Sequence, residues 1–72
     1  MTKFQRMRED LGFKRSEFGY IFNVTGQTIA HWERGTSNPT LKRKIKIAKF
    51  FNIPFIEVNE LFKEDVDTKE NE

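Results

Sequence analysis

Few side chains in this sequence of 72 residues could carry out covalent chemistry. His31 is the only histidine, cysteine is absent, and neither His31 nor Ser16 stands in a motif that would activate it. The chain has no glycine-rich phosphate loop and no set of His, Asp and Glu with the spacing of metal ligands. The sequence therefore predicts a protein that is not an enzyme, holds no metal or cofactor, and has no small-molecule substrate.

The charged side chains are unevenly distributed and point to a different kind of chemistry. Residues 1–50 carry eleven Lys and Arg against four Asp and Glu, a net charge of +7. Residues 51–72 carry two Lys against seven Asp and Glu, a net charge of −5. A basic region of this kind can face phosphate groups.

The same charge pattern suggests a folded domain followed by a tail. Residues 63–72 contain one valine and no other large apolar side chain, so we expect a disordered acidic tail after a domain spanning residues 1–62. No apolar run approaches the ~20 residues of a membrane span, and no signal peptide opens the chain. We expect a cytoplasmic protein with no membrane partner.

Apolar residues recur at helical spacing along the domain, which predicts five short helices. Their apolar sets are, in chain order, Phe4, Met7 and Leu11; Phe18, Ile21 and Phe22; Ile29 and Trp32; Leu41, Ile45, Ala48 and Phe51; and Phe55, Val58, Leu61 and Phe62. A second set of residues marks the helix ends. The predicted N-caps are Thr2, Thr25 and Thr40, and Gln5 completes a capping box with Thr2. The helices are predicted to end at Gly12, Asn23, Gly35 and Asn52. Pro54 can start the fifth helix.

The second and third predicted helices are joined by only a few residues around Val24, which is helix-turn-helix spacing. Residues 15–34 resemble the Cro/repressor (XRE-type) family. Gly19 stands where the family has a small residue because the third helix crosses closely, and Asn23 replaces the usual turn glycine. The family's buried positions are matched by Phe18, Phe22, Val24, Ile29 and Trp32, and its characteristic ending by Trp32-Glu33-Arg34-Gly35, Asn38-Pro39 and Leu41.

The resemblance covers about residues 3–62 and implies an all-α fold. The fold would be a compact five-helix bundle of the lambda-repressor-like DNA-binding domain type, with the helix-turn-helix at the second and third helices. In this family the third helix enters the major groove.

The resemblance places four positions of the third helix toward DNA, namely Gly26, Gln27, Thr28 and His31. The Gln27 amide can pair with adenine N6 and N7, Thr28 can donate to an acceptor or meet a thymine methyl, and His31 can donate to guanine or phosphate. Gly26 has no side chain and would let a phosphate or a protein approach closely. This helix lacks the commonest guanine contact, because it has no Lys or Arg before Arg34. The alternative is that these positions are only solvated polar surface.

A second group of side chains would contact phosphates at helix starts and in a loop. These residues are Lys14, Arg15, Asn38, Lys42 and Arg43. Helix N-termini already favour anions through their free N–H groups. The alternative is a solvated basic face without a ligand.

Three further features of the sequence favour structural roles. Arg8 and Glu33 match family positions that often form a partly buried ion pair, so we expect them to join the first helix to the third. Phe50 and Phe51 are adjacent and are not expected to face the same core. Phe55, Ile56 and Phe62 would form a homodimer contact through the last helix, or else simply fill the core.

Two functions of different kinds remain open, and double-stranded DNA or a partner repressor protein is the expected partner. The first is a small DNA-binding transcriptional regulator, Cro- or repressor-like, that acts by operator occupancy. The second is an antirepressor that binds a partner repressor through the helix-turn-helix surface and blocks its DNA binding. Three features favour the antirepressor: the lack of Lys and Arg on the third helix before Arg34, the surplus of Phe and Ile, and the acidic tail. A third possibility, an antitoxin, would need a longer toxin-binding segment.

Overall fold

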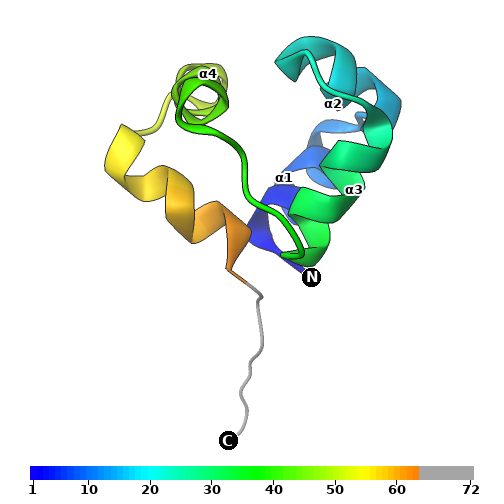
Figure 1. Ribbon diagram of the computed structural model, residues 1–72, viewed down its shortest axis with the longest axis horizontal. Coiled ribbons are helices and arrows are strands. Elements are labelled where there is room, and N and C mark those ends of the chain that lie inside the picture. The colour runs from blue at the N-terminus through cyan, green and yellow to red at the C-terminus, as the bar shows by residue number, and fades with distance from the viewer. Residues whose placement is uncertain (64–72) are drawn as a thin grey trace, which may run out of the picture.

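The computed structural model describes residues 1–63, which form four α-helices and one 3₁₀ helix (Figure 1). The helices are α1 (Lys3–Leu11), α2 (Arg15–Phe22), α3 (Gly26–Arg34), α4 (Leu41–Phe51) and η1 (Phe55–Phe62). The prediction of five helices is confirmed. Lys63 is the only residue of the expected acidic tail that is described, and the rest of that expectation lies outside the described residues.

The helices form a bundle that η1 closes. In Figure 1, α2 and α3 lie on one side of the molecule, and α4 and η1 lie on the other. η1 packs against α1, α3 and α4, whereas α2 packs against α3 and α4. The last helix is therefore part of the bundle core, because it contacts three of the four α-helices.

Threonine side chains cap three of the α-helices, as the sequence predicts. Each hydroxyl accepts a hydrogen bond from the amide three residues on, at 3.2 Å for Thr2, 3.0 Å for Thr25 and 3.4 Å for Thr40. The capping box expected at α1 is only half formed. The Gln5 side-chain amide donates to the Glu9 carboxylate at 3.2 Å and does not turn back to Thr2.

Left-handed residues end all four α-helices at the predicted positions. Gly12, Asn23, Gly35 and Asn52 have φ values of 81°, 60°, 76° and 56°. Glycine adopts this conformation without a Cβ penalty, and asparagine tolerates it better than most other residues. Asn23 thereby makes the tight turn between α2 and α3.

Phe4 is the centre of an aromatic core to which every helix contributes. Its ring centroid lies between 4.8 and 6.3 Å from those of Phe18, Phe22, Trp32, Phe51 and Phe62. The buried apolar residues are Phe4, Phe18, Phe22, Ile29, Trp32, Ile47, Ala48, Val58, Leu61 and Phe62. One ring from α1 therefore links the whole bundle.

The predicted apolar stripe of α4 is partly wrong. Leu41 and Ile45 are 65% and 43% exposed, whereas Ile47 is fully buried. The reason is that the buried residues of α4, Ile47 and Ala48, lie in its second half. Leu11 is also exposed, because it is the last residue of α1 and Arg8 takes the buried position one turn after Phe4.

The expectation that Phe50 and Phe51 do not face the same core is confirmed only in part, since Phe51 packs against the core and Phe50 lies at its edge. Their ring centroids lie 5.7 and 6.1 Å from that of Phe18, so both rings contact the same aromatic side chain. Successive side chains on an α-helix diverge by about 100°, and the Phe18 ring lies within reach of both. Phe50 stays 38% exposed at the edge of this cluster.

The fifth helix differs from the expected one in its hydrogen bonding. η1 is a 3₁₀ helix, in which residues three apart share a face, and Val58 and Leu61 are buried at that spacing. Pro54 precedes the helix in an extended conformation and is not its first residue. Phe55, expected in the apolar set, is 47% exposed at the start of the helix.

Candidate nucleic-acid interface

The α3 helix is held against α2 by close backbone contact. A Cβ atom on Gly19 would lie 2.6 Å from the Val24 carbonyl oxygen and 3.0 Å from the Gly26 nitrogen. Such distances are too short for any side chain, so only glycine permits the crossing. The prediction that α3 crosses closely at Gly19 is confirmed, and this contact fixes the angle at which α3 is presented.

Gly26 faces α2, which corrects the expectation that it points outward. A Cβ atom there would lie 3.3 Å from the Ser16 nitrogen and 3.4 Å from the Ser16 Cα. The first turn of α3 packs on the first turn of α2, and the missing side chain makes room for that contact. The absence of a side chain at Gly26 therefore serves helix packing.

The exposed start of α3 carries one free amide and one engaged hydroxyl. Gln27 is exposed, and its side chain makes no hydrogen bond within residues 1–63. The Thr28 hydroxyl lies 3.0 Å from that of Thr25, the N-cap of the same helix. The Gln27 amide therefore has its full hydrogen-bonding capacity available to a ligand, whereas the Thr28 hydroxyl does not.

His31 is held by its Nδ1 edge. This nitrogen lies 3.1 Å from the Thr36 hydroxyl and 3.4 Å from Arg34 Nη2, and the Thr36 hydroxyl also donates to the His31 carbonyl oxygen at 3.2 Å. The side chain is half-buried. Since Nδ1 is engaged, Nε2 is the ring nitrogen left for a ligand.

Three of the predicted phosphate contacts are free on the surface. Lys14, Asn38 and Lys42 are exposed, and their side chains make no hydrogen bond within the described part of the chain. Lys14 precedes α2, and its backbone N–H donates to the Glu17 carboxylate at 2.6 Å. Glu17 therefore completes this helix start in place of a capping hydroxyl.

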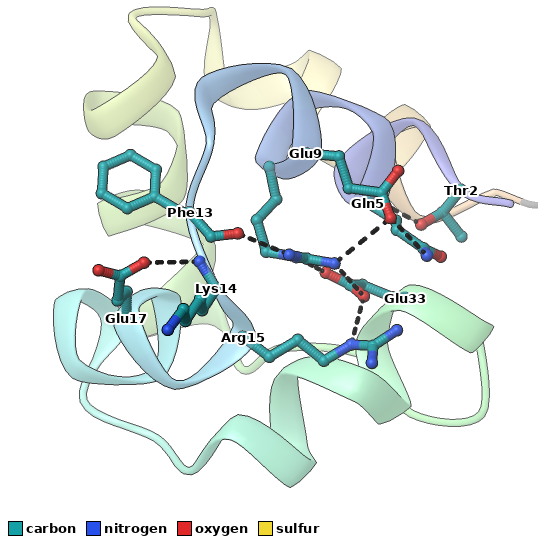
Figure 2. Close-up of polar contacts among 9 residues, drawn as sticks. Thr2, Gln5, Glu9, Phe13, Lys14, Arg15, Glu17 and Glu33 are labelled. Carbon is teal, nitrogen blue, oxygen red and sulfur yellow. Dashed lines mark hydrogen bonds and ion pairs between the residues drawn. The ribbon is translucent and has the colours of Figure 1, made fainter.

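Arg8, Glu33 and Arg15 form a charge network in which Arg8 and Glu33 are buried and Arg15 is half-exposed (Figure 2). Arg8 Nε lies 2.5 Å from Glu33 Oε2, and Arg15 Nε lies 2.9 Å from Glu33 Oε1. Arg8 also donates to the Phe13 carbonyl oxygen at 2.6 Å. The network joins α1, the following loop, α2 and α3. The link to Arg15 is absent from the sequence-based expectations, because 18 residues separate the two partners and no local pattern connects them.

Arg43 also has a partner inside the protein. Its Nη2 donates to the Asn23 carbonyl oxygen at 3.0 Å, which ties α4 to the turn between α2 and α3. Its Nε is buried without a partner among the described residues. Lys42, Arg43 and Lys46 line one pocket together with Phe22 and Asn23. Three cationic side chains therefore surround one opening beside the turn.

Other kinds of site find little support in the described part of the chain. Among residues 1–63, no group of three or more His, Cys, Asp and Glu could hold a metal ion. No helix in this range has the length and apolar character needed to cross a membrane.

A comparison with protein families matches the whole helix-turn-helix region. A family model described as Helix-turn-helix matches residues 4–58, which cover nearly all of α1, the other three α-helices and half of η1. No curated protein and no solved structure matches the chain.

Proposed function

The chain belongs to the Cro/C1-type helix-turn-helix family of DNA-binding regulators, with a lambda-repressor-like fold, and we propose that it regulates transcription by occupying an operator. In this proposal α3 enters the major groove. Gln27 pairs with adenine, the Thr28 methyl meets a thymine methyl, and His31 offers Nε2 to a base or phosphate. Gly26 contributes only its backbone.

The observation that carries this proposal is the exposed, unpartnered Gln27 amide on the first turn of α3. Free cationic side chains lie at the starts of the neighbouring helices, with Lys14 before α2 and Lys42 in α4. An amide on the first turn and cations at the flanking helix starts suit base reading and phosphate contact respectively. Arg15, Asn38 and Arg43 complete the proposed phosphate contacts.

A two-fold dimer is part of the proposed mechanism. Phe62 is buried in the core and cannot form the dimer contact expected of it, but Phe55 and Ile56 are 47% and 83% exposed at the start of η1. Two copies joined there would read half-sites about 34 Å apart, one turn of DNA.

A second candidate function is an antirepressor that docks on a partner repressor. Large apolar side chains at the surface favour it, since Tyr20 is 90% exposed and Leu41 is 65% exposed. The surplus of phenylalanine, which favours an antirepressor, also serves the fold itself, because most phenylalanines fill the core or pack against it.

Fluorescence anisotropy tests the first proposal. The protein is titrated into DNA from around its own gene and into a scrambled control. We expect specific binding tighter than about 10⁻⁷ M at ~0.1 M salt, with a steep salt dependence. Weak binding of equal strength to both DNAs would favour the antirepressor, and a neighbouring repressor bound to its DNA would then be added to see whether the DNA is released.

Two variants separate base reading from phosphate contact. Gln27→Ala should reduce the discrimination between operator and scrambled DNA by about 1–3 kcal/mol, because it removes a base contact. Lys42→Ala should weaken binding to both DNAs alike and lower the salt slope by about 0.9. Unchanged discrimination in Gln27→Ala would remove Gln27 from the reading surface.

A further inference from the structure

The buried Glu33 carboxylate binds one more arginine than its charge requires. The Glu33 side chain is fully buried, and that of Arg8 is 8% exposed. Arg8 donates to both carboxylate oxygens, from Nε at 2.5 Å and from Nη2 at 3.3 Å, and its Nη1 donates to the Phe13 carbonyl. Arg8 alone therefore neutralises Glu33 and has a partner for each of its nitrogens. Arg15 adds a second positive charge beside Glu33, and the half-exposed Glu9 carboxylate, 3.7 Å from Arg8 Nη2, is the second negative charge of the network.

Arg15 is bound to Glu33 by one edge only. Its Nε donates to Glu33 Oε1 at 2.9 Å, while its side chain is 46% exposed. Its Nη1 and Nη2 make no hydrogen bond within residues 1–63, and in Figure 2 no dashed line reaches them. Because the guanidinium group is planar and rigid, a bond from Nε to a fixed acceptor restricts the orientation of the whole group. The two terminal nitrogens are therefore held in a defined orientation while remaining open to solvent.

The position of Arg15 in the fold suits an anionic ligand. Arg15 is the first residue of α2, where backbone N–H groups have no partner within the helix. A guanidinium group binds a phosphate best through two parallel N–H donors, which is what its terminal nitrogens offer. A freely rotating side chain would lose conformational entropy on binding, whereas a side chain already held in place loses less.

We infer that Glu33 is a positioning residue, which holds the Arg15 guanidinium so that both terminal nitrogens meet one phosphate of the DNA backbone. The inference rests on the proposed function, because its ligand is a DNA phosphate. It assigns Glu33 a second role beside its pairing with Arg8. It also makes arginine, and not merely a positive charge, the requirement at position 15.

The test compares charge-conserving and charge-removing variants at two positions. Arg15→Lys should bind DNA as weakly as Arg15→Ala, with affinity lowered roughly tenfold at ~0.1 M salt and the salt slope lowered by about 0.9. The reason is that a single ammonium group can pair with Glu33 or with a phosphate but not with both. At the exposed Lys49, which lies outside the proposed DNA contacts, neither Lys49→Arg nor Lys49→Ala should change the affinity for DNA. Circular dichroism of each variant establishes that it is folded.

Each outcome has a distinct meaning. If Arg15→Lys binds DNA with the wild-type affinity and salt slope, the positioning role is overturned and the proposed function stands. If the wild-type protein shows no salt-dependent DNA binding, both are overturned. A second measurement does not depend on DNA, namely hydrogen exchange of the Arg15 Nε–H followed by NMR. Exchange as fast as in the unfolded chain would also overturn the inference, whereas slowed exchange supports it.

Discussion

At the scale of single residues, several side chains assigned to DNA contact are also bonded within the protein. Arg15 is bonded to Glu33, Arg43 to the Asn23 carbonyl, and His31 to Thr36. Each retains at least one nitrogen without a partner. Side chains held in this way are oriented before a ligand arrives, which reduces the entropy lost on binding.

Removing Arg8, which is not among the proposed DNA contacts, should destabilise the fold. In Arg8→Ala, Glu33 would keep only the half-exposed Arg15 as a partner, and breaking a buried ion pair costs about 3–5 kcal/mol. Urea unfolding followed by Trp32 fluorescence measures the change in the free energy of unfolding. Lys49→Ala, at an exposed position of α4, is the matched control and should change little. A midpoint for Arg8→Ala equal to that of the wild type would show that the pair is not structural.

At the scale of elements, the helix-turn-helix depends on two glycines and one asparagine. Gly19 and Gly26 let α2 and α3 approach each other, and Asn23 supplies the left-handed turn between them. The two close contacts differ in severity. A Cβ on Gly19 would meet the Val24 carbonyl at 2.6 Å, whereas a Cβ on Gly26 would come no closer than 3.3 Å to the Ser16 backbone.

Substitution of the two glycines should therefore have unequal effects. Gly19→Ala should lower the free energy of unfolding by about 1–3 kcal/mol, because the added methyl group pushes α3 away from α2. Gly26→Ala should cost less, since a smaller shift relieves its contact and alanine favours the helix. Thermal unfolding of both variants, monitored by circular dichroism, gives the comparison. The opposite order of stabilities would mean that α3 is not held at Gly19.

At the scale of the whole molecule, one aromatic cluster supports all five helices. Because Phe4 contacts rings from α2, α3, α4 and η1, the bundle has a single core. Total stability for a chain of this size is on the order of 0.1 kcal/mol per residue. The surface that remains apolar, at Phe55 and Ile56, lies outside this core and is the proposed dimer contact.

If the proposed dimer forms through η1, a charged substitution in that helix should change the oligomeric state. Ile56→Glu should shift the protein from dimer to monomer, because it places a charge in the apolar contact. Analytical ultracentrifugation over a range of concentrations measures the mass. Tyr20→Glu is the matched control, since Tyr20 is 90% exposed but lies on α2, and it should leave the dimer intact. A wild-type protein that is monomeric at every concentration would contradict the proposal.

The sequence by itself determined the features that depend on neighbouring residues. Threonine caps, left-handed Asn and Gly stops, and the close crossing at Gly19 are all confirmed. The helix-turn-helix family also follows from local residue types at a fixed spacing, and the family model matches residues 4–58.

Only the tertiary structure decided which side chains are free and which are bound. Arg15 and Glu33 are 18 residues apart, and Arg43 and Asn23 are 20 residues apart, so no local pattern predicts their bonds. The exposure of Leu41 and the burial of Ile47 likewise depend on which part of α4 the other helices cover. Periodicity identifies the faces of a helix, but the packing of distant segments selects the face that is buried and the charges that remain available to a ligand.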